Sequence, residues 1–395
     1  MNAKKKVRVE FRKNLRKPPR ANKLRGEELV RDAEARERVA DGSTSGERIS
    51  GRGELTRRRT VMVEAGASGV GETLARQVDE AGCVYGRVVR ARGTVYHVAL
   101  EKPASAGRPF LDCSVRRVVK TLAIDDRAAV VAGDRVLVRP EGMEVSDSVS
   151  TAPAQGVIER VEPRRGVLTR KAKGRRHVLA ANVDLMMIVG SAADPPLKPG
   201  LVDRYLVSAR LGGIEPVIVV NKCDLVDAAE LQPLAGTYGQ LGYEIVLAST
   251  RTGRGIARLR SLMRGRTTAF TGQSGVGKSS LINAIEPSLN LKISHINEDS
   301  RKGRHTTTIA SLFPLPTGGW VVDTPGIRSL ELWHVVPGEV EAFFVEFHPF
   351  LRDCRFADCS HRHESECGVK RALALGYIRH ERYESYVRIY EGDAS

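Results

Sequence analysis

The sequence predicts a multidomain α/β protein with a small N-terminal β-barrel, a central domain built on a buried, mainly parallel sheet, and a helical C-terminal domain. Three observations lead to this prediction. Short runs that alternate apolar with polar residues recur between residues 80 and 170. Apolar runs separated by helix-length segments occupy residues 175–330. Residues 331–395 are helix-prone and contain a cluster of cysteines.

The composition is typical of a globular protein with a polyanionic partner. Of the 395 residues, 41% are hydrophobic and 28% are charged, and no apolar run approaches the roughly 18 residues that span a bilayer. We therefore expect no membrane association. The net charge of +16 makes nucleic acid the first partner to consider. The N-terminus lacks the apolar region of a secretory signal and the cysteines form no disulfide pattern, which predicts a cytoplasmic protein.

The N-terminal part is predicted to contain a basic arm followed by a barrel. Residues 1–75 are rich in Lys, Arg, Glu, Gly and Ser and poor in aromatics, so we expect a mostly disordered arm. The strand-like runs in residues 80–170 fit an OB-type barrel that binds RNA. A barrel that serves only for packing is the alternative. The basic side chains expected on its outer surface are Arg87, Arg90, Arg116, Arg117 and Lys120.

A phosphate-binding loop lies in the central domain, residues 175–330. It has the full G-x-x-x-x-G-K-[ST] pattern, with a β-type run before it and a helical run after it. The glycines allow backbone N–H groups to surround phosphate oxygens, Lys278 reaches the outer phosphates, and the Ser279 hydroxyl suits Mg²⁺. The residues predicted to bind a nucleoside triphosphate here are Gly272, Gln273, Ser274, Gly275, Val276, Gly277, Lys278, Ser279 and Ser280.

Two segments upstream of this loop predict that the base is guanine. A buried strand ends in N-K-x-D, formed by Asn221, Lys222 and Asp224. The Asp224 carboxylate can accept hydrogen bonds from the ring N–H and the exocyclic amine of guanine, and adenine would leave it unpaired. A second loop, with Ser249, resembles the base-contact loop of GTP-binding proteins, although an ordinary strand-to-helix turn is the alternative.

Two segments downstream of the loop predict the rest of a GTP site. Asp323 ends a strand in D-x-x-G, where it would help to hold Mg²⁺ and the N–H of Gly326 would face the γ-phosphate. Between the phosphate loop and Asp323 lie three threonines, residues 306–308, in a polar stretch of the kind that becomes ordered on a triphosphate. Thr307 is our first choice among the three as a magnesium ligand.

The order of these motifs predicts a circularly permuted domain. Common small GTPases have the phosphate loop first and N-K-x-D near the end, whereas here residues 221–224 precede residues 272–279. Permutation leaves the geometry of the site intact, because the termini of such domains lie close together at the surface.

The C-terminal cysteine cluster predicts one structural zinc ion. Cys354, Cys359, His361 and Cys367 have the spacing C-x4-C-x-H-x5-C, and three thiolates with one imidazole complete a tetrahedral Zn²⁺ site that leaves no position for a substrate. His363 is the competing imidazole. Free buried cysteines are the alternative for the whole cluster.

The motifs in this order resemble the RsgA (YjeQ) family of small ribosomal subunit biogenesis GTPases. The resemblance covers roughly residues 80 to 390 and includes GQSGVGKSS, GRHTTT, DTPGIRSL and the cysteine cluster. It implies an OB domain, a permuted GTPase domain and a zinc domain, and slow GTP hydrolysis that the small (30S) subunit stimulates during late maturation. It also implies His305 as the residue that positions the attacking water, because Ile327 after Gly326 cannot do so.

Other functions remain compatible with these residues. A GTP-switched RNA-binding protein that acts on mRNA or tRNA would show the same charge and barrel. A kinase or ATPase conflicts with N-K-x-D. A basic-loop histidine that contacts phosphate or RNA is the alternative for His305. We expect a monomer whose partners are the small ribosomal subunit and its rRNA, and whose ligands are GTP, Mg²⁺ and Zn²⁺.

Overall fold

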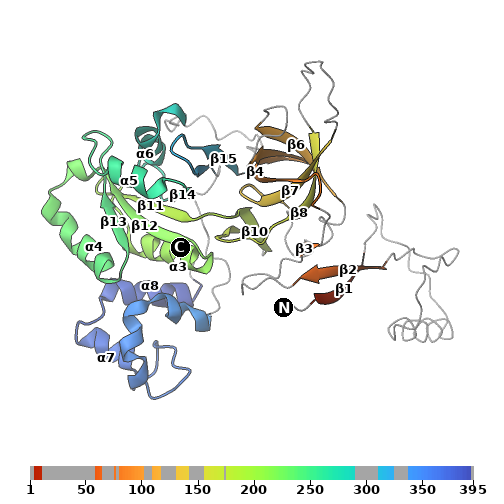
Figure 1. Ribbon diagram of the computed structural model, residues 1–395. Helices are drawn as coiled ribbons and strands as arrows, with labels where there is room; N and C mark the ends of the chain where they lie inside the picture. The colour runs from red at the N-terminus through yellow and green to blue at the C-terminus, as the bar shows by residue number, and fades with distance from the viewer. Residues whose placement is uncertain are drawn as a thin grey trace, which may run out of the picture. The chain divides into compact units, whose positions relative to one another are not determined.

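The computed structural model describes residues 4–10, 58–64, 75–76, 80–101, 109–116, 130–141, 155–172, 175–289, 310–323 and 337–392 (Figure 1). The chain divides into two compact units, Met1–Ala65 and Gly66–Ser395. Each unit is described separately below.

In the first unit, strands β1 (Lys4–Glu10) and β2 (Arg58–Glu64) form an antiparallel pair in which Val7 lies opposite Val61. The composition of residues 1–75 predicts a mostly disordered arm, and these two strands lie within that range. Both alternate valine with polar or basic residues, a pattern that favours strands over disorder. The remainder of the predicted arm before Ala65 lies outside the described residues.

The second unit begins with a short strand, β3 (Ala75–Arg76), and a closed barrel. The barrel follows the order β4-β5-β6-β8-β7, and β7 also pairs with β4. The pairing of β6 with β8 is parallel, and the other pairings are antiparallel. This arrangement confirms the predicted OB-type barrel. Its strands are β4 (Val84–Arg92), β5 (Val95–Leu100), β6 (Phe110–Val115), β7 (Arg135–Glu141) and β8 (Gln155–Val161).

The barrel contacts the central domain through polar as well as apolar groups. Arg87 donates from Nη1 to Oγ1 of Thr267 over 2.5 Å, and burial lowers the pKa of its guanidinium. Arg87 thus lies on the outer surface of the barrel, as expected, but it is only partly exposed there. Alternation showed that Arg87 points away from the barrel core, but the outer surface of β4 is covered there by the next domain. Arg90 and Arg116 are exposed, as expected, and Arg117 and Lys120 lie outside the described residues.

The central domain is a doubly covered sheet with the strand order β13-β12-β11-β14-β16-β15. All of these strands are parallel except β15, which runs antiparallel to β16. A hairpin of β9 (Leu168–Ala172) and β10 (Arg175–Ala180) precedes the sheet. The sheet strands are β11 (Leu185–Ser191), β12 (Glu215–Asn221), β13 (Glu244–Leu247), β14 (Thr267–Thr271), β15 (Ser311–Pro314) and β16 (Trp320–Asp323).

Helices cover both faces of this sheet. Every residue of β11 is buried: Met186 and Ile188 pack with α3 and α4 on one face, and Leu185 and Met187 pack with α5 and α6 on the other. This is why the strands have continuous apolar runs instead of alternation. The helices are α3 (Pro199–Leu211), α4 (Ala228–Gln240), α5 (Ile256–Met263) and α6 (Lys278–Ile285), with 3₁₀ turns η1 (Cys223–Leu225) and η2 (Pro287–Leu289).

The C-terminal domain packs on α3 through α8 (Figure 1). Its core includes Phe344, Phe347 and Tyr386, with Val207 contributed by α3. The elements are the 3₁₀ segments η4 (Pro337–Phe343) and η5 (Val345–Asp353) and the helices α7 (Gly368–Ala374) and α8 (His380–Tyr390). Within the described ranges, no helix combines the length and the hydropathy of a membrane span.

Candidate functional site

The predicted nucleotide residues gather at one edge of the central sheet. Asn221 ends β12, Ser249 follows β13, Gly272 follows β14 and Asp323 ends β16. These strands are parallel, so their carboxyl ends lie at the same edge, where open α/β sheets bind ligands. Segments that are distant in the sequence are thus brought together in the order that the permutation requires.

The phosphate loop depends on its glycines. Gly272 has a φ of +137°, and a Cβ on it would lie 2.0 Å from the carbonyl oxygen of Val189. The ammonium of Lys278 bends back over the loop and donates to the carbonyl oxygens of Gly272 at 2.8 Å and Gln273 at 2.6 Å. The positive charge of the Lys278 ammonium therefore lies at the centre of the loop, next to the N-terminal end of α6.

Asn221 joins the N-K-x-D segment to the phosphate loop. Its Nδ2 donates to the carbonyl oxygen of Val276 over 2.8 Å. Gly277, which caps α6 with a φ of +89°, leaves the room for this contact, because a Cβ there would lie 2.5 Å from the same Nδ2. Among the described residues, the buried Oδ1 of Asn221 has no hydrogen-bond partner. It is a polar atom that a ligand could satisfy.

The Asp224 carboxylate lies in η1, after β12, next to Ser249 of the loop that follows β13. A hydrogen bond from Ser249 lowers the pKa of Asp224, and the charge of Arg251 acts in the same direction. Ser249 is buried, and its Oγ accepts from the backbone N–H of Thr252. Nε of Arg251 lies 3.0 Å from Oδ2 of Asp224, with 76% of the arginine side chain exposed. We did not single out Arg251 from the sequence, although it is two residues from Ser249.

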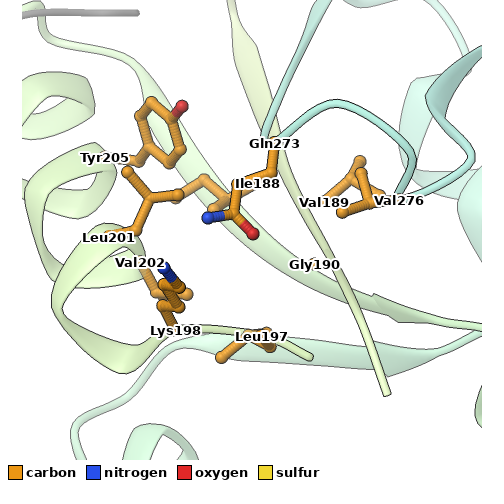
Figure 2. A pocket seen from close by; sticks show the side chains of 10 residues that line it. All are labelled: Ile188, Val189, Gly190, Leu197, Lys198, Leu201, Val202, Tyr205, Gln273 and Val276. Carbon is orange, nitrogen blue, oxygen red and sulfur yellow. The ribbon is translucent and has the colours of Figure 1, made fainter. Parts of the chain in front are cut away.

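A cavity lies between α3 and the phosphate loop (Figure 2). Tyr205 and Leu201 approach it from α3, Lys198 approaches it from the position just before that helix, and Gln273 approaches it from the loop. The full lining is Ile188, Val189, Gly190, Leu197, Lys198, Leu201, Val202, Tyr205, Gln273 and Val276. Sequence analysis did not indicate that α3 contributes to this part of the site, since its residues have the ordinary pattern of a packed helix.

The switch side of the site is described only at Asp323, which is exposed at the end of β16. Desolvation raises the pKa of Asp323, and the positive charge of Arg90 opposes this shift. The predicted residues Thr307, His305 and Gly326 lie outside the described residues.

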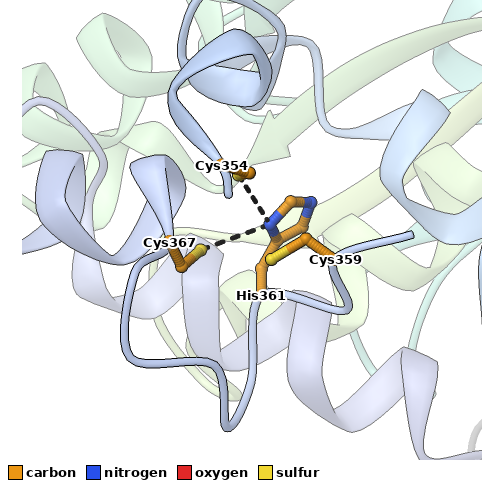
Figure 3. A group of neighbouring side chains, drawn as sticks. All are labelled: Cys354, Cys359, His361 and Cys367. Carbon is orange, nitrogen blue, oxygen red and sulfur yellow. Dashed lines mark hydrogen bonds between the residues drawn. The ribbon is translucent and has the colours of Figure 1, made fainter. Parts of the chain in front are cut away.

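The four predicted zinc ligands lie together in the C-terminal domain (Figure 3). Nδ1 of His361 is 3.3 Å from Sγ of Cys367 and 3.6 Å from Sγ of Cys354, and all four ligand atoms, including that of Cys359, lie within 4.8 Å of one another. Ligands of a tetrahedral Zn²⁺ are about 3.5–3.8 Å apart, so these residues fit the ion. The side chain of the competing residue, His363, is 76% exposed and is not part of the cluster.

The surroundings of the cluster fit a cation as well. Burial raises the pKa of Cys359 to about 12 and also raises that of Cys367, so packing these thiols together disfavours thiolates unless a positive charge is present. Nε2 of His361 lies 2.8 Å from Oε2 of Glu341, which orients Nδ1 toward the sulfur atoms. Sequence analysis missed Glu341, because it lies 20 residues before His361 in a different segment.

Comparisons with known proteins give a consistent result. The family model described as RsgA GTPase matches residues 161–333. The chain is 42% identical over 287 residues to "Small ribosomal subunit biogenesis GTPase RsgA 1" of Vibrio vulnificus (strain YJ016), covering 71% of this chain and 77% of that protein. It is 40% identical over 312 residues to RsgA of Chlorobaculum parvum, covering 77% of this chain and 96% of that protein.

Two solved structures agree with these relatives. YjeQ from Thermotoga maritima superposes with a TM-score of 0.61 at 33% identity and covers 78% of this chain and 98% of its own. YloQ, described as a circularly permuted GTPase, gives a TM-score of 0.59 at 27% identity, with 80% and 97% covered. The description of YloQ as circularly permuted agrees with the order of motifs in this sequence. The chain belongs to the RsgA family of circularly permuted GTPases and is a GTP hydrolase.

Proposed function

We propose that this protein binds the small ribosomal subunit and acts in its late maturation, and that hydrolysis of GTP to GDP and phosphate releases it. The names of its relatives, which are small ribosomal subunit biogenesis GTPases, support the assignment to the subunit. The single structural observation that carries the GTP-dependent part of the proposal is the contact of Asn221 with Val276, which joins the guanine motif to the phosphate loop. The net charge of +16 suits rRNA as the surface that is bound.

In this proposal each motif has a defined role. Asp224 and Ser249 recognise guanine, residues 272–280 hold the phosphates, and Ser279 with Thr307 holds Mg²⁺, which neutralises charge on the phosphates. Asp323 supports the metal, and the N–H of Gly326 faces the γ-phosphate. The argument for guanine is chemical, since a carboxylate pairs with two adjacent donors that adenine lacks.

We propose His305 as the catalytic residue, because an imidazole can orient or accept a proton from water near neutral pH. His305→Ala should preserve GTP affinity and lower turnover, with His295→Ala, a histidine outside the motifs, as the control. Equal hydrolysis by His305→Ala and the unchanged protein would remove His305 from the mechanism.

We propose that Cys354, Cys359, His361 and Cys367 bind one structural Zn²⁺ per chain. The ion would hold the loop between η5 and α7 in place. Metal analysis of the purified protein should then find about one zinc per chain, and Cys359→Ala should lower that content. The proposal also places the protein in the cytoplasm, where small subunits mature.

Titrating purified small subunits into a GTP hydrolysis assay tests the proposed function. We expect slow hydrolysis alone and faster hydrolysis with subunits, and co-sedimentation of the protein with subunits when a non-hydrolysable GTP analogue is present. Free mRNA or tRNA at equal nucleotide concentration is the control. If free RNA stimulates as strongly as subunits do, the protein acts on RNA away from the ribosome and the assignment to the subunit is wrong.

A further inference from the structure

Two aromatic rings form an exposed stack on the outside of the barrel. The ring centroids of His97 on β5 and Phe110 on β6 are 5.1 Å apart, with an angle of 11° between the ring planes. Phe110 is 38% exposed, and 45% of the His97 side chain is exposed. Val95, on the same side of β5, is 46% exposed. Large apolar groups that gather on an exposed strand face indicate a binding surface more often than isolated ones do.

The barrel does not need these rings for its own packing. Along β5 the side chains of Tyr96 and Val98 point into the barrel core, and along β6 Leu111 and Cys113 do the same. His97 and Phe110 belong to the opposite, outward face of their strands because side chains alternate. Their stacking therefore contributes little to the apolar core, and a face of the pair remains accessible to a flat ligand.

Arginines lie beside the stack on the neighbouring strand. Arg90 of β4 is directly opposite His97, and Arg92 is opposite Val95, and both arginines are exposed. Directly opposite residues of an antiparallel pair project from the same face, so these guanidinium groups border the rings. Asp112, the acidic neighbour on β6, hydrogen-bonds to Nδ1 of His97 at 2.9 Å and so holds the imidazole in place.

Positive charge beside stacked aromatic rings is the arrangement by which proteins bind single-stranded nucleic acid. Bases stack on the rings, and guanidinium groups contact the phosphates. A duplex cannot use such a surface, because its bases are already stacked on one another and only their edges are accessible. Strands β5 and β6 are also the second and third strands of this OB-type barrel, the face on which such barrels bind oligonucleotides.

We propose that the surface formed by Arg90, Arg92, His97 and Phe110, here called the stacking face, binds an unpaired segment of RNA, with a base stacked on the rings and its phosphates at the arginines. This inference rests on the proposed function, which supplies rRNA as the partner, and it specifies that the barrel contacts unpaired nucleotides and not a helix.

Binding of a fluorescent oligouridylate of about 12 nucleotides to the full-length protein, followed by anisotropy, tests the stacking face. Phe110→Ala should weaken binding about 5- to 150-fold, the range measured for loss of one base-stacking aromatic. Phe110→Tyr, which keeps the ring, should bind within about twofold of the unchanged protein. An RNA duplex of equal length should bind equally to Phe110→Ala and to the unchanged protein.

Tyr85→Ala is the matched control. Tyr85 is an exposed aromatic on the same strand as Arg90 and Arg92, but it lies opposite Leu137 of β7, and its hydroxyl contacts Glu80 and Arg160. The Tyr85→Ala substitution should leave oligouridylate binding unchanged. Unaltered GTP affinity of the Phe110 and Tyr85 variants confirms that each of these folds.

The salt dependence separates stacking from phosphate contacts. Arg90→Gln and Arg92→Gln should each reduce the slope of log affinity against log salt by about 0.7, the value per phosphate contact on a single strand. Phe110→Ala should weaken binding with the slope unchanged, because a ring contact releases no counterions.

The proposal is overturned if the unchanged protein does not bind oligouridylate, if Phe110→Ala and Tyr85→Ala weaken binding equally, or if Phe110→Ala weakens duplex binding as much. A protein-binding role for this face would give the second of these outcomes. Stimulation of the unchanged protein by small subunits is measured separately. A stimulated enzyme with an inactive stacking face contradicts only this inference, whereas absent stimulation contradicts the proposed function.

Discussion

Arg90 of the barrel and Asp323 of the D-T-P-G segment belong to one row of cross-strand neighbours, with Ser311 of β15 between them. Strands are about 4.8 Å apart, so the two backbones are separated by about 10 Å, and directly opposite residues project from the same face of a sheet. A residue of the stacking face is therefore also a neighbour of the carboxylate proposed to support Mg²⁺.

The first prediction concerns this relationship. Arg90→Gln should tighten Mg²⁺ binding to the nucleotide complex about fourfold at low ionic strength, because two unit charges 10 Å apart in water repel by about 0.4 kcal/mol and Mg²⁺ carries two. The effect should disappear near 0.5 M salt, where screening is strong. Magnesium titration of GTP hydrolysis measures it. Arg92→Gln, opposite Val95, is the control, and an equal change in both variants contradicts a specific effect of Arg90.

The second prediction concerns the guanine pocket. The exposed Arg251 forms an ion pair with the Asp224 carboxylate, so guanine must displace the arginine to reach the carboxylate. Arg251→Ala should raise the affinity for GDP about two- to fivefold, the modest range expected for an exposed ion pair. Competition with a fluorescent GDP analogue measures this affinity. Arg254→Ala, an exposed arginine of the same loop, should change nothing. Weaker binding by Arg251→Ala would mean that this side chain contacts the base and does not compete with it.

The third prediction concerns Gly277. Gly277→Ala places a Cβ 2.5 Å from Nδ2 of Asn221 at a φ of +89°, so the loop must shift and the contact of Asn221 with Val276 is lost. We expect GTP affinity to fall at least tenfold by calorimetry, since both the base motif and the phosphate loop move. Gly236→Ala on α4, with no atom near the added Cβ, should leave affinity unchanged and stabilise the helix slightly. Unchanged affinity of Gly277→Ala would refute the coupling between the two motifs.

The sequence predicted those parts of the fold and site that depend on local patterns. Alternation predicted the barrel strands, and continuous apolar runs predicted a sheet covered on both faces. The motifs could be combined into one site because they follow parallel strands, whose carboxyl ends meet at one edge. The ligands at residues 354–367 could be predicted because all of them lie in a short segment with zinc spacing.

Contacts between distant segments could not be predicted in this way. Alternation shows which side of a strand a residue occupies, but not whether another domain covers that side, and for this reason the contact of Arg87 with Thr267 was not predicted. Glu341 and Arg382 have no local pattern that distinguishes them from ordinary charged surface residues. Only the fold brings them to His361 and Asp203. Charged groups that join domains are therefore the class that sequence analysis missed.

The fourth prediction concerns the zinc cluster. Glu341→Gln should weaken Zn²⁺ binding about 10- to 100-fold, as expected when the carboxylate that orients a histidine ligand is lost. Competition against a chromophoric chelator measures the affinity without reference to GTP hydrolysis. Glu339→Gln, an exposed residue of the same 3₁₀ segment, is the control. Equal zinc affinity in the Glu341→Gln and Glu339→Gln variants would show that Glu341 does not orient His361.

The fifth prediction concerns the charged network between the central and C-terminal domains. Arg382 of α8 is buried, and its Nη1 lies 2.6 Å from Oδ1 of Asp203 on α3, while its Nε lies 2.6 Å from Oε1 of Glu346. The hydroxyl of Tyr238 also donates to Asp203, over 2.7 Å. Desolvation raises the pKa of Asp203, and the charge of Arg382 opposes this shift.

Arg382→Met should therefore lower the free energy of unfolding by about 3–5 kcal/mol, because it leaves the Asp203 carboxylate buried without its counter-charge. Adding Asp203→Asn should recover part of this loss, since the amide removes the uncompensated charge and still accepts from Tyr238. Urea unfolding of the full-length protein measures both. Arg388→Met on the exposed side of α8, where the arginine pairs with Glu384, should cost less than about 1 kcal/mol. If the double variant loses as much as the sum of the two single ones, Arg382 and Asp203 do not stabilise each other, and apolar packing alone holds α8 on α3.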